Sequence, residues 1–130
     1  MEEKLATIKI WMILANKRIE VAEKLYELNY FDDATSRAYY GMFHAAKAAL
    51  LSIDVEVKSH AGVVNQFSQQ FIKAGQVERK YGRMLSLAMR ARELSDYGTQ
   101  VYLSETTAEA TIADAKLFVA KIKEILQNRS

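Results

Sequence analysis

The sequence contains no cysteine and no proline, and it has only five glycines among 130 residues. Without cysteine, disulfides, cysteine-based zinc sites and a cysteine nucleophile are all excluded, and two histidines make a metal site unexpected. Short-stranded sheets need many turn residues, so the scarcity of proline and glycine favours long helices. We therefore expect an all-α protein of a reducing cytoplasm, without a metal or another cofactor.

Long apolar runs are missing as well. No stretch approaches the roughly 18 apolar residues that span a bilayer, and the apolar piece from Ile8 to Ala15 is interrupted by Lys9. We expect neither a signal peptide nor a lipid anchor, and no association with a membrane. Half of the residues are hydrophobic, which is enough for one core in a single domain covering residues 1–130.

Charge is distributed unevenly, although the net charge is only +2. Between residues 93 and 115 every charged residue is acidic. The preceding stretch, residues 73–92, has a single acid, Glu78, against six basic residues: Lys73, Arg79, Lys80, Arg83, Arg90 and Arg92. One surface region should be basic, which by itself gives weak support for nucleic-acid binding.

Apolar residues recur at helical spacing in five segments, which predict an up-and-down bundle of four long helices with one additional short helix. The first helix ends near Leu28, the second covers Asp33–Ser52, the third runs from Ser59 to Ala74, and the fourth covers Val77–Tyr97. The fifth starts at Thr106, after an extended link over residues 99–104. Predicted caps are Asp32 or Asp33, Ser59, Gly75, Gly98, and Thr106 with Glu109.

Each predicted helix has an apolar face. The expected face of the fourth helix is Met84, Leu87, Ala91 and Leu94. The other predicted faces are Leu5, Ile8, Met12, Ala15, Ile19, Ala22 and Tyr26 in the first helix, Val64, Phe67 and Phe71 in the third, and Ile112, Ala115, Val119, Ile122 and Leu126 in the last.

Arg37, Tyr40 and His44 form the first candidate site. Arg37 and His44 are seven residues apart, which places them on one helical face about 10 Å apart, with Tyr40 between them. Arginine can grip a phosphate and histidine can transfer protons near neutral pH. The same spacing also suits partly buried polar groups that satisfy one another at a helix seam, so both interpretations stay open.

Arg92, Asp96 and Tyr97 form the second candidate site. Arg92 and Asp96 are four residues apart and can pair along the helix, which is an ordinary structural arrangement. The functional interpretation makes Arg92 a phosphate contact, Asp96 its positioning partner and Tyr97 a side chain that closes the site. His60 follows the predicted cap Ser59 and is expected to face solvent.

Three blocks in this order resemble the short, stand-alone HEPN proteins of bacteria and archaea: SRAYYGMFHAA at 36–46, KSH at 58–60 and RELSDY at 92–97. The resemblance covers about residues 8–125. It implies a helical bundle, usually a homodimer, related to the helical substrate-binding domain of kanamycin nucleotidyltransferase. It also implies a small nucleotidyltransferase as a partner, since such pairs often form toxin–antitoxin modules.

The resemblance also implies a possible activity, because many HEPN toxins are metal-independent ribonucleases with an arginine and a histidine four to six residues apart. Here Arg92 is followed by Asp96 and Tyr97 instead of a histidine. The leading hypothesis is therefore a non-catalytic domain that binds nucleotides or RNA. Alternatives are a ribonuclease toxin in which Arg37, His44 and Arg92 converge, and a scaffold that binds only protein.

Overall fold

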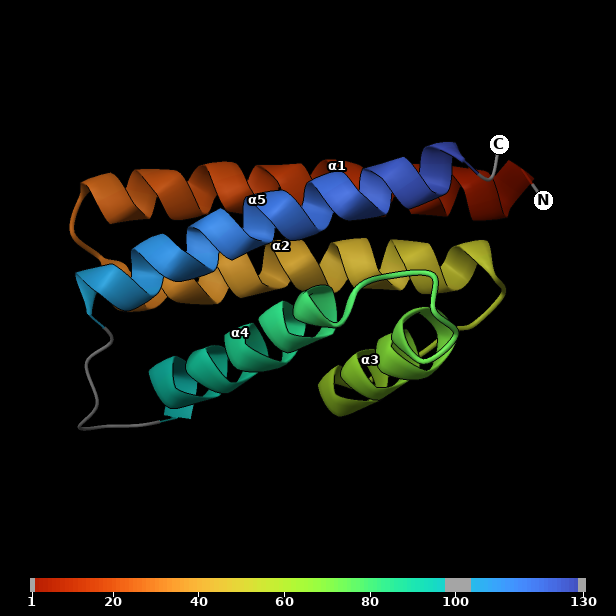
Figure 1. Ribbon diagram of the computed structural model, residues 1–130. Coiled ribbons are helices and arrows are strands. Elements are labelled where there is room, and N and C mark those ends of the chain that lie inside the picture. Colours follow the sequence, from red (N-terminus) through yellow and green to blue (C-terminus); the bar gives the residue numbers. More distant parts are fainter. Residues whose placement is uncertain (1, 98–103, 129–130) are drawn as a thin grey trace.

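The computed structural model describes residues 2–97 and 104–128, all of them in helices or short connections. The helices are α1 (Glu2–Glu27), α2 (Phe31–Ser52), α3 (His60–Phe67), α4 (Arg79–Tyr97) and α5 (Glu105–Gln127), and α3 continues into a π-helical turn, η1 (Ser68–Ile72). The four long helices alternate in direction, and α3 lies beside them as a short addition (Figure 1). The predicted all-α, five-helix architecture is confirmed.

Helix α2 is the central element, since it packs against α1, α3, α4 and α5. Its small residues let neighbouring backbones come close. A Cβ atom on Gly41 would lie 2.9 Å from Cγ1 of Ile19 and 3.1 Å from the carbonyl oxygen of Ala15. A larger residue at position 41 would therefore push α1 and α2 apart.

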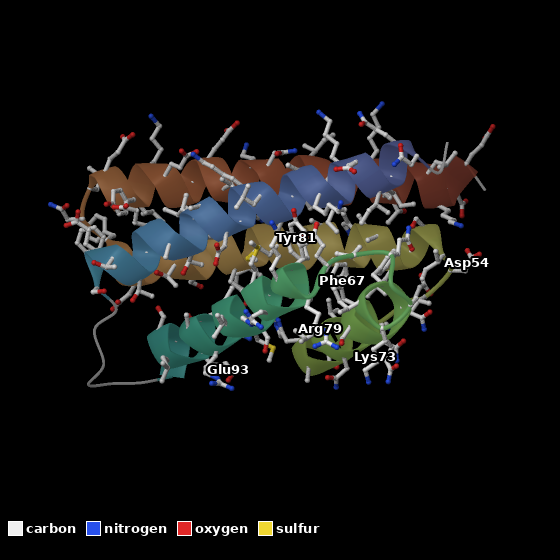
Figure 2. All side chains as sticks on the ribbon, in the orientation of Figure 1. Asp54, Phe67, Lys73, Arg79, Tyr81 and Glu93 are labelled. Atoms are coloured by element: carbon white, nitrogen blue, oxygen red, sulfur yellow. The ribbon has the colours of Figure 1, made fainter. Side chains whose placement is uncertain are left out.

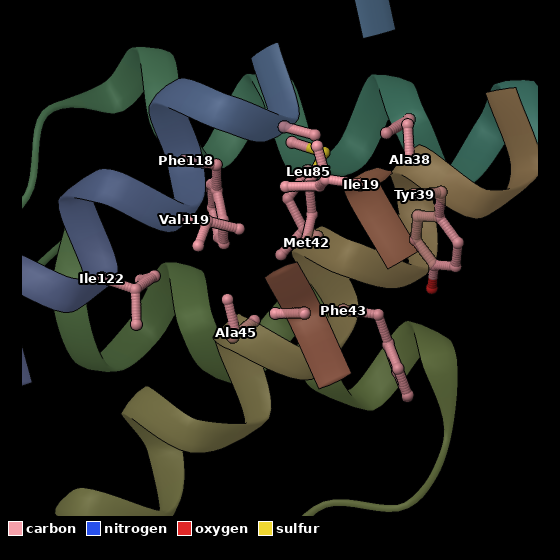
Figure 3. Close-up of a cluster of buried hydrophobic side chains, with 14 of the residues drawn as sticks. Ile19, Ala38, Tyr39, Met42, Phe43, Ala45, Leu85, Phe118, Val119 and Ile122 are labelled. Carbon is pink, nitrogen blue, oxygen red and sulfur yellow. The ribbon is translucent and has the colours of Figure 1, made fainter. Parts of the chain in front are cut away.

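The core lies between α2 and the helices around it, α1, α3, α4 and α5, and Figure 3 shows part of it. Phe118 from α5 and Phe67 from α3 are fully buried, with ring centroids 5.2 Å apart, and Phe71 stacks on Phe67 at the same distance. Other fully buried side chains in this core include Tyr39, Met42, Leu85 and Ile122. This core holds α3 against α2 and α4.

Two predicted N-caps are wrong. Helix α2 begins at Phe31 after Tyr30, so Asp32 and Asp33 lie in its first turn, where acidic residues favour the positive end of the helix dipole. Helix α5 is capped by Ser104, whose hydroxyl accepts a hydrogen bond from the amide of Thr107 at 3.1 Å, and not by Thr106. Ser59 does cap α3, through a hydrogen bond from the amide of Gly62.

The predicted face of α4 is wrong in register. Leu87 and Leu94 are exposed, whereas Leu85, Ala88 and Arg92 are buried. The prediction from apolar spacing placed arginine on the exposed face of the helix. Arg92 is nevertheless buried, because it pairs with Asp96 and two tyrosine rings lie over its guanidinium.

Other predictions near the ends of the helices have mixed outcomes. Leu5 of α1 is exposed instead of buried, while Ile8, Ala15 and Ala22 are buried as predicted. Gly75 has the expected positive φ of 82°. The predicted Gly98 cap and the link that follows it lie outside the described residues, apart from Ser104.

Within the described helices, no segment is long and apolar enough to cross a membrane.

Candidate functional site

The candidate site is the place where α2, the start of α3 and the end of α4 meet. It contains Tyr39, Tyr40, His60, Arg92 and Asp96, which are far apart in the sequence. Helix α2 supplies the two tyrosines and helix α4 the arginine and the aspartate. His60 is the first residue of α3, held there by the Ser59 cap.

Arg92 is the centre of this cluster and is only 5% exposed. Its Nη1 donates to Oδ2 of Asp96 at 3.3 Å, and its guanidinium carbon lies 5.4 Å from the ring centre of Tyr39 and 5.8 Å from that of Tyr40. A planar guanidinium suits such stacking, and a desolvated cation over an aromatic face is strongly attracted to it. Arg92 is thus a positive charge enclosed by aromatic rings.

Tyr39 links Arg92 to His60. The Tyr39 hydroxyl lies 2.6 Å from Nδ1 of His60, and the guanidinium of Arg92 lies over the Tyr39 ring. Burial raises the pKa of Tyr39 well above its usual value, so the hydroxyl stays protonated. We therefore assign Tyr39 as the donor and Nδ1 of His60 as the acceptor of this hydrogen bond.

This direction of donation fixes the state of the His60 ring. Nδ1 accepts a hydrogen bond, so neutral His60 carries its proton on Nε2. Nε2 has no hydrogen-bond partner among the residues that the structure describes. The Tyr39–His60 hydrogen bond therefore leaves an N–H donor on His60 that is available to a ligand.

The surroundings keep His60 neutral. Its ring lies 4.6 Å from that of Phe43 and 5.8 Å from that of Tyr40. Burial lowers the pKa of His60, the charges of Arg92 and Lys47 lower it further, and Glu93 and Asp96 act in the opposite direction. The prediction that His60 faces solvent is correct only in part, because the aromatic residues of α2 cover one side of its ring and leave the residue partly buried.

Arg37 and His44 lie differently. Arg37 is exposed and forms no hydrogen bond or ion pair with any described residue. His44 is half-buried next to Tyr40, with ring centroids 6.4 Å apart, and its Nδ1 is buried without a partner in the described part of the chain. Burial and the nearby charges of Arg18 and Lys47 lower the pKa of His44.

The two sequence blocks are thus only partly brought together. Tyr40 of the first block meets Arg92 and Asp96 of the second, whereas Arg37 takes part in none of these contacts. Position 97 belongs to α4, but the side chain of Tyr97 lies outside the described residues. The sequence argument missed Tyr39 and underestimated His60, for which the only available signal was membership of the KSH block.

We expect the two lowered histidine pKa values to make stability depend on pH. Unfolded histidine has a pKa near 6.5, so as pH falls below about 6.5 the unfolded chain binds protons that the folded chain does not. Neutral His44 and His60 therefore make their full contribution to the free energy of unfolding above about pH 6.5. This contribution is lost as the pH falls from there through the lower pKa values of the two histidines in the folded protein.

Urea unfolding near pH 7.5 and near pH 5.5 should therefore give a smaller pH difference for the variant His44→Gln/His60→Gln than for the wild type. Carboxylates contribute to both proteins, so comparing the two differences isolates the histidines. An equal loss of stability in the two proteins would contradict the lowered pKa values.

The described residues contain no group of three or more histidine, aspartate or glutamate side chains that could hold a metal ion. What they do offer is a charged and aromatic surface: a buried cation, a histidine N–H donor, and the half-buried ring of Tyr40. Such a set can bind an anionic group beside a planar ring, as in a nucleotide.

Comparison with known proteins finds a matching domain family and several similar proteins. The chain matches the HEPN domain over residues 8–125. It is 38% identical over 114 residues to "Putative toxin MJ0605" of Methanocaldococcus jannaschii, covering 88% of this chain and 84% of that protein. It is 31% identical over 116 residues to "Putative toxin MJ0142" of the same organism, covering 89% and 79%.

A UPF0332 protein of Thermotoga maritima is 27% identical over 128 residues, which are 98% of this chain and 97% of that protein. Each of these alignments covers most of this chain and most of the related protein. The domain match includes all three sequence blocks, at 36–46, 58–60 and 92–97. The chain therefore belongs to the HEPN domain family.

Proposed function

We propose that this HEPN chain binds RNA or a nucleotide at the Tyr39–Tyr40–His60–Arg92–Asp96 site, in the cytoplasm. The observation that carries the proposal is the Tyr39–His60 hydrogen bond next to the buried Arg92, which presents a donor beside the ring of Tyr40. A phosphate oxygen accepts from Nε2 of His60, and a base stacks on Tyr40. The buried charge of Arg92 adds positive electrostatic potential to the site.

The biological setting that we propose is a toxin–antitoxin module with a separately encoded small nucleotidyltransferase, in which the HEPN chain forms a homodimer. The support is that two relatives have names containing the word toxin. In such a module the nucleotidyltransferase would control access to the RNA-binding component. The alternative to nucleotide or RNA binding is a scaffold that binds only other proteins.

A metal-independent ribonuclease is the second candidate, and one observation favours it. His60 and Arg92 are 32 residues apart in the sequence but share one cluster, so His60 restores an arginine–histidine pair although position 96 is an aspartate. Attack by the ribose 2′-hydroxyl requires a base, however, and Nε2 of neutral His60 already carries a proton. The geometry therefore favours binding over proton abstraction, and a neutral His60 has no imidazolium proton to donate to a leaving group.

Thermal unfolding with a panel of nucleotides and short RNAs, followed by sizing of the RNA, tests the proposal. A ligand at about 100 times its Kd stabilises the fold by about 2.7 kcal/mol, which for a chain of this length raises Tm by about 10 °C. We expect such a shift without cleavage. Cleavage lost in His60→Ala or His44→Ala would support the ribonuclease, and the absence of any shift would leave the scaffold.

A further inference from the structure

A basic groove lies between the end of α3, η1 and the start of α4, away from the Arg92 cluster. It has a volume of about 420 Å³ and three basic side chains at its walls, Lys73, Arg79 and Arg83. Figure 2 labels two of these cations, Lys73 directly after η1 and Arg79 at the start of α4. The other lining residues are Val64, Asn65, Ser68, Ile72, Gly82 and Ser86.

The three cations have no compensation from acids. None of the lining residues is acidic, and none of the three cations forms an ion pair with a described residue. Arg79 and Arg83 are four residues apart on α4, a spacing at which like charges destabilise a helix by a few tenths of a kcal/mol. All three side chains are exposed, so an anion in the groove would replace solvent and counterions beside them and reduce this repulsion.

The backbone here is shaped to bring these cations together. The π-helical turn η1 closes with a hydrogen bond from the amide of Lys73 to the carbonyl of Ser68. Such turns are rare in proteins as a whole, and those that occur often lie at functional sites. A Cβ on Gly82 would lie 3.3 Å from Cγ1 of Ile72, so glycine allows α4 to pack closely against η1. Arg79 and Arg83 are thereby held across from Lys73.

The lining chemistry fits the phosphates of RNA. Asn65, Ser68 and Ser86 add neutral hydrogen-bonding groups to the three cations, a combination typical of contacts to a nucleic-acid backbone. No aromatic residue lines the groove, so bases are not stacked there. Ser68 lies eight residues after His60 on the continuous α3–η1 segment, about 12 Å along the axis, so one strand could contact both sites.

We propose that this groove binds the phosphodiester backbone of single-stranded RNA, as an extension of the Tyr40–His60–Arg92 site. The inference rests on the proposed function, since the base and one phosphate would occupy that site. Contacts in the groove are sequence-independent and depend on salt, because each neutralised phosphate releases counterions.

Fluorescence anisotropy with a mixed-sequence RNA of about 12 nucleotides tests the inference, with AMP as the short ligand. The double variant Arg79→Gln/Arg83→Gln should bind this RNA about tenfold more weakly and reduce the slope of log K against log salt by about 1.4. Its affinity for AMP should equal that of the wild type. The matched control Lys17→Gln/Lys24→Gln, exposed on α1, has the same charge change and should keep the wild-type slope.

The outcomes separate the two proposals. If the wild type binds the RNA and the two double variants behave alike, the groove proposal fails and the proposed function stands. If the wild type binds neither the RNA nor AMP, both fail. Displacement of the RNA from the groove by polyglutamate at an equal concentration would assign the groove to an acidic protein and would also overturn the inference.

Discussion

Replacing Phe118 with alanine is expected to lower the free energy of unfolding by about 3–5 kcal/mol. The side chain is fully buried, and its ring lies 5.2 Å from that of Phe67, so it joins α5 to α3. Truncation removes this apolar contact and leaves a cavity, because the surrounding helices can relax only partly. Urea unfolding measured by circular dichroism gives the change directly.

Leu117→Ala is the matched control, since Leu117 is the preceding residue on the same helix and is 54% exposed. Its loss should be within about 0.5 kcal/mol, as for most surface substitutions. Similar losses in the two variants would mean that α5 does not present Phe118 to the core. The variant Phe118→Ala should also bind nucleotides more weakly, because α3 carries His60.

Much of the fold could be predicted because its signals are local. The spacing of apolar residues in α1, α3 and α5 follows directly from helix geometry, and Ser59 caps α3 as its sequence position suggests. Caps were less predictable where two candidates are close together: Ser104 and Thr106 have similar chemistry, and only the backbone geometry selects Ser104. Local sequence does not contain that choice.

The register of α4 and the position of His60 could not be predicted, because both depend on tertiary contacts. A sequence pattern assigns an arginine to the surface, but Arg92 is buried since Asp96 balances its charge and two tyrosine rings cover it. His60 joins the site because α3 packs against α2. Helical spacing within α2 gave equal support to a structural and to a functional role of Arg37 and His44, and their functional role stays an untested prediction.

The variant Arg92→Met is expected to weaken RNA and nucleotide binding by about 10- to 100-fold, the range for a lost charge-assisted hydrogen bond. Methionine keeps much of the side-chain volume but removes the positive charge that lies over the Tyr39 ring. Without that charge the Tyr39 ring is held less firmly, and His60 loses its fixed orientation. Binding is measured by titration with AMP and with the short RNA.

A second measurement separates this role from simple loss of structure. The charge of Arg92 lowers the pKa of His60, so in Arg92→Met that pKa should rise toward the usual histidine value, as followed by NMR titration of the ring. Arg92→Lys keeps a positive charge but loses the planar guanidinium, and should keep the low pKa while still binding weakly. The exposed Arg37→Met should change neither quantity. A folded Arg92→Met protein with unchanged affinity and an unchanged His60 pKa would remove Arg92 from the site and leave its burial as a purely structural feature of α4.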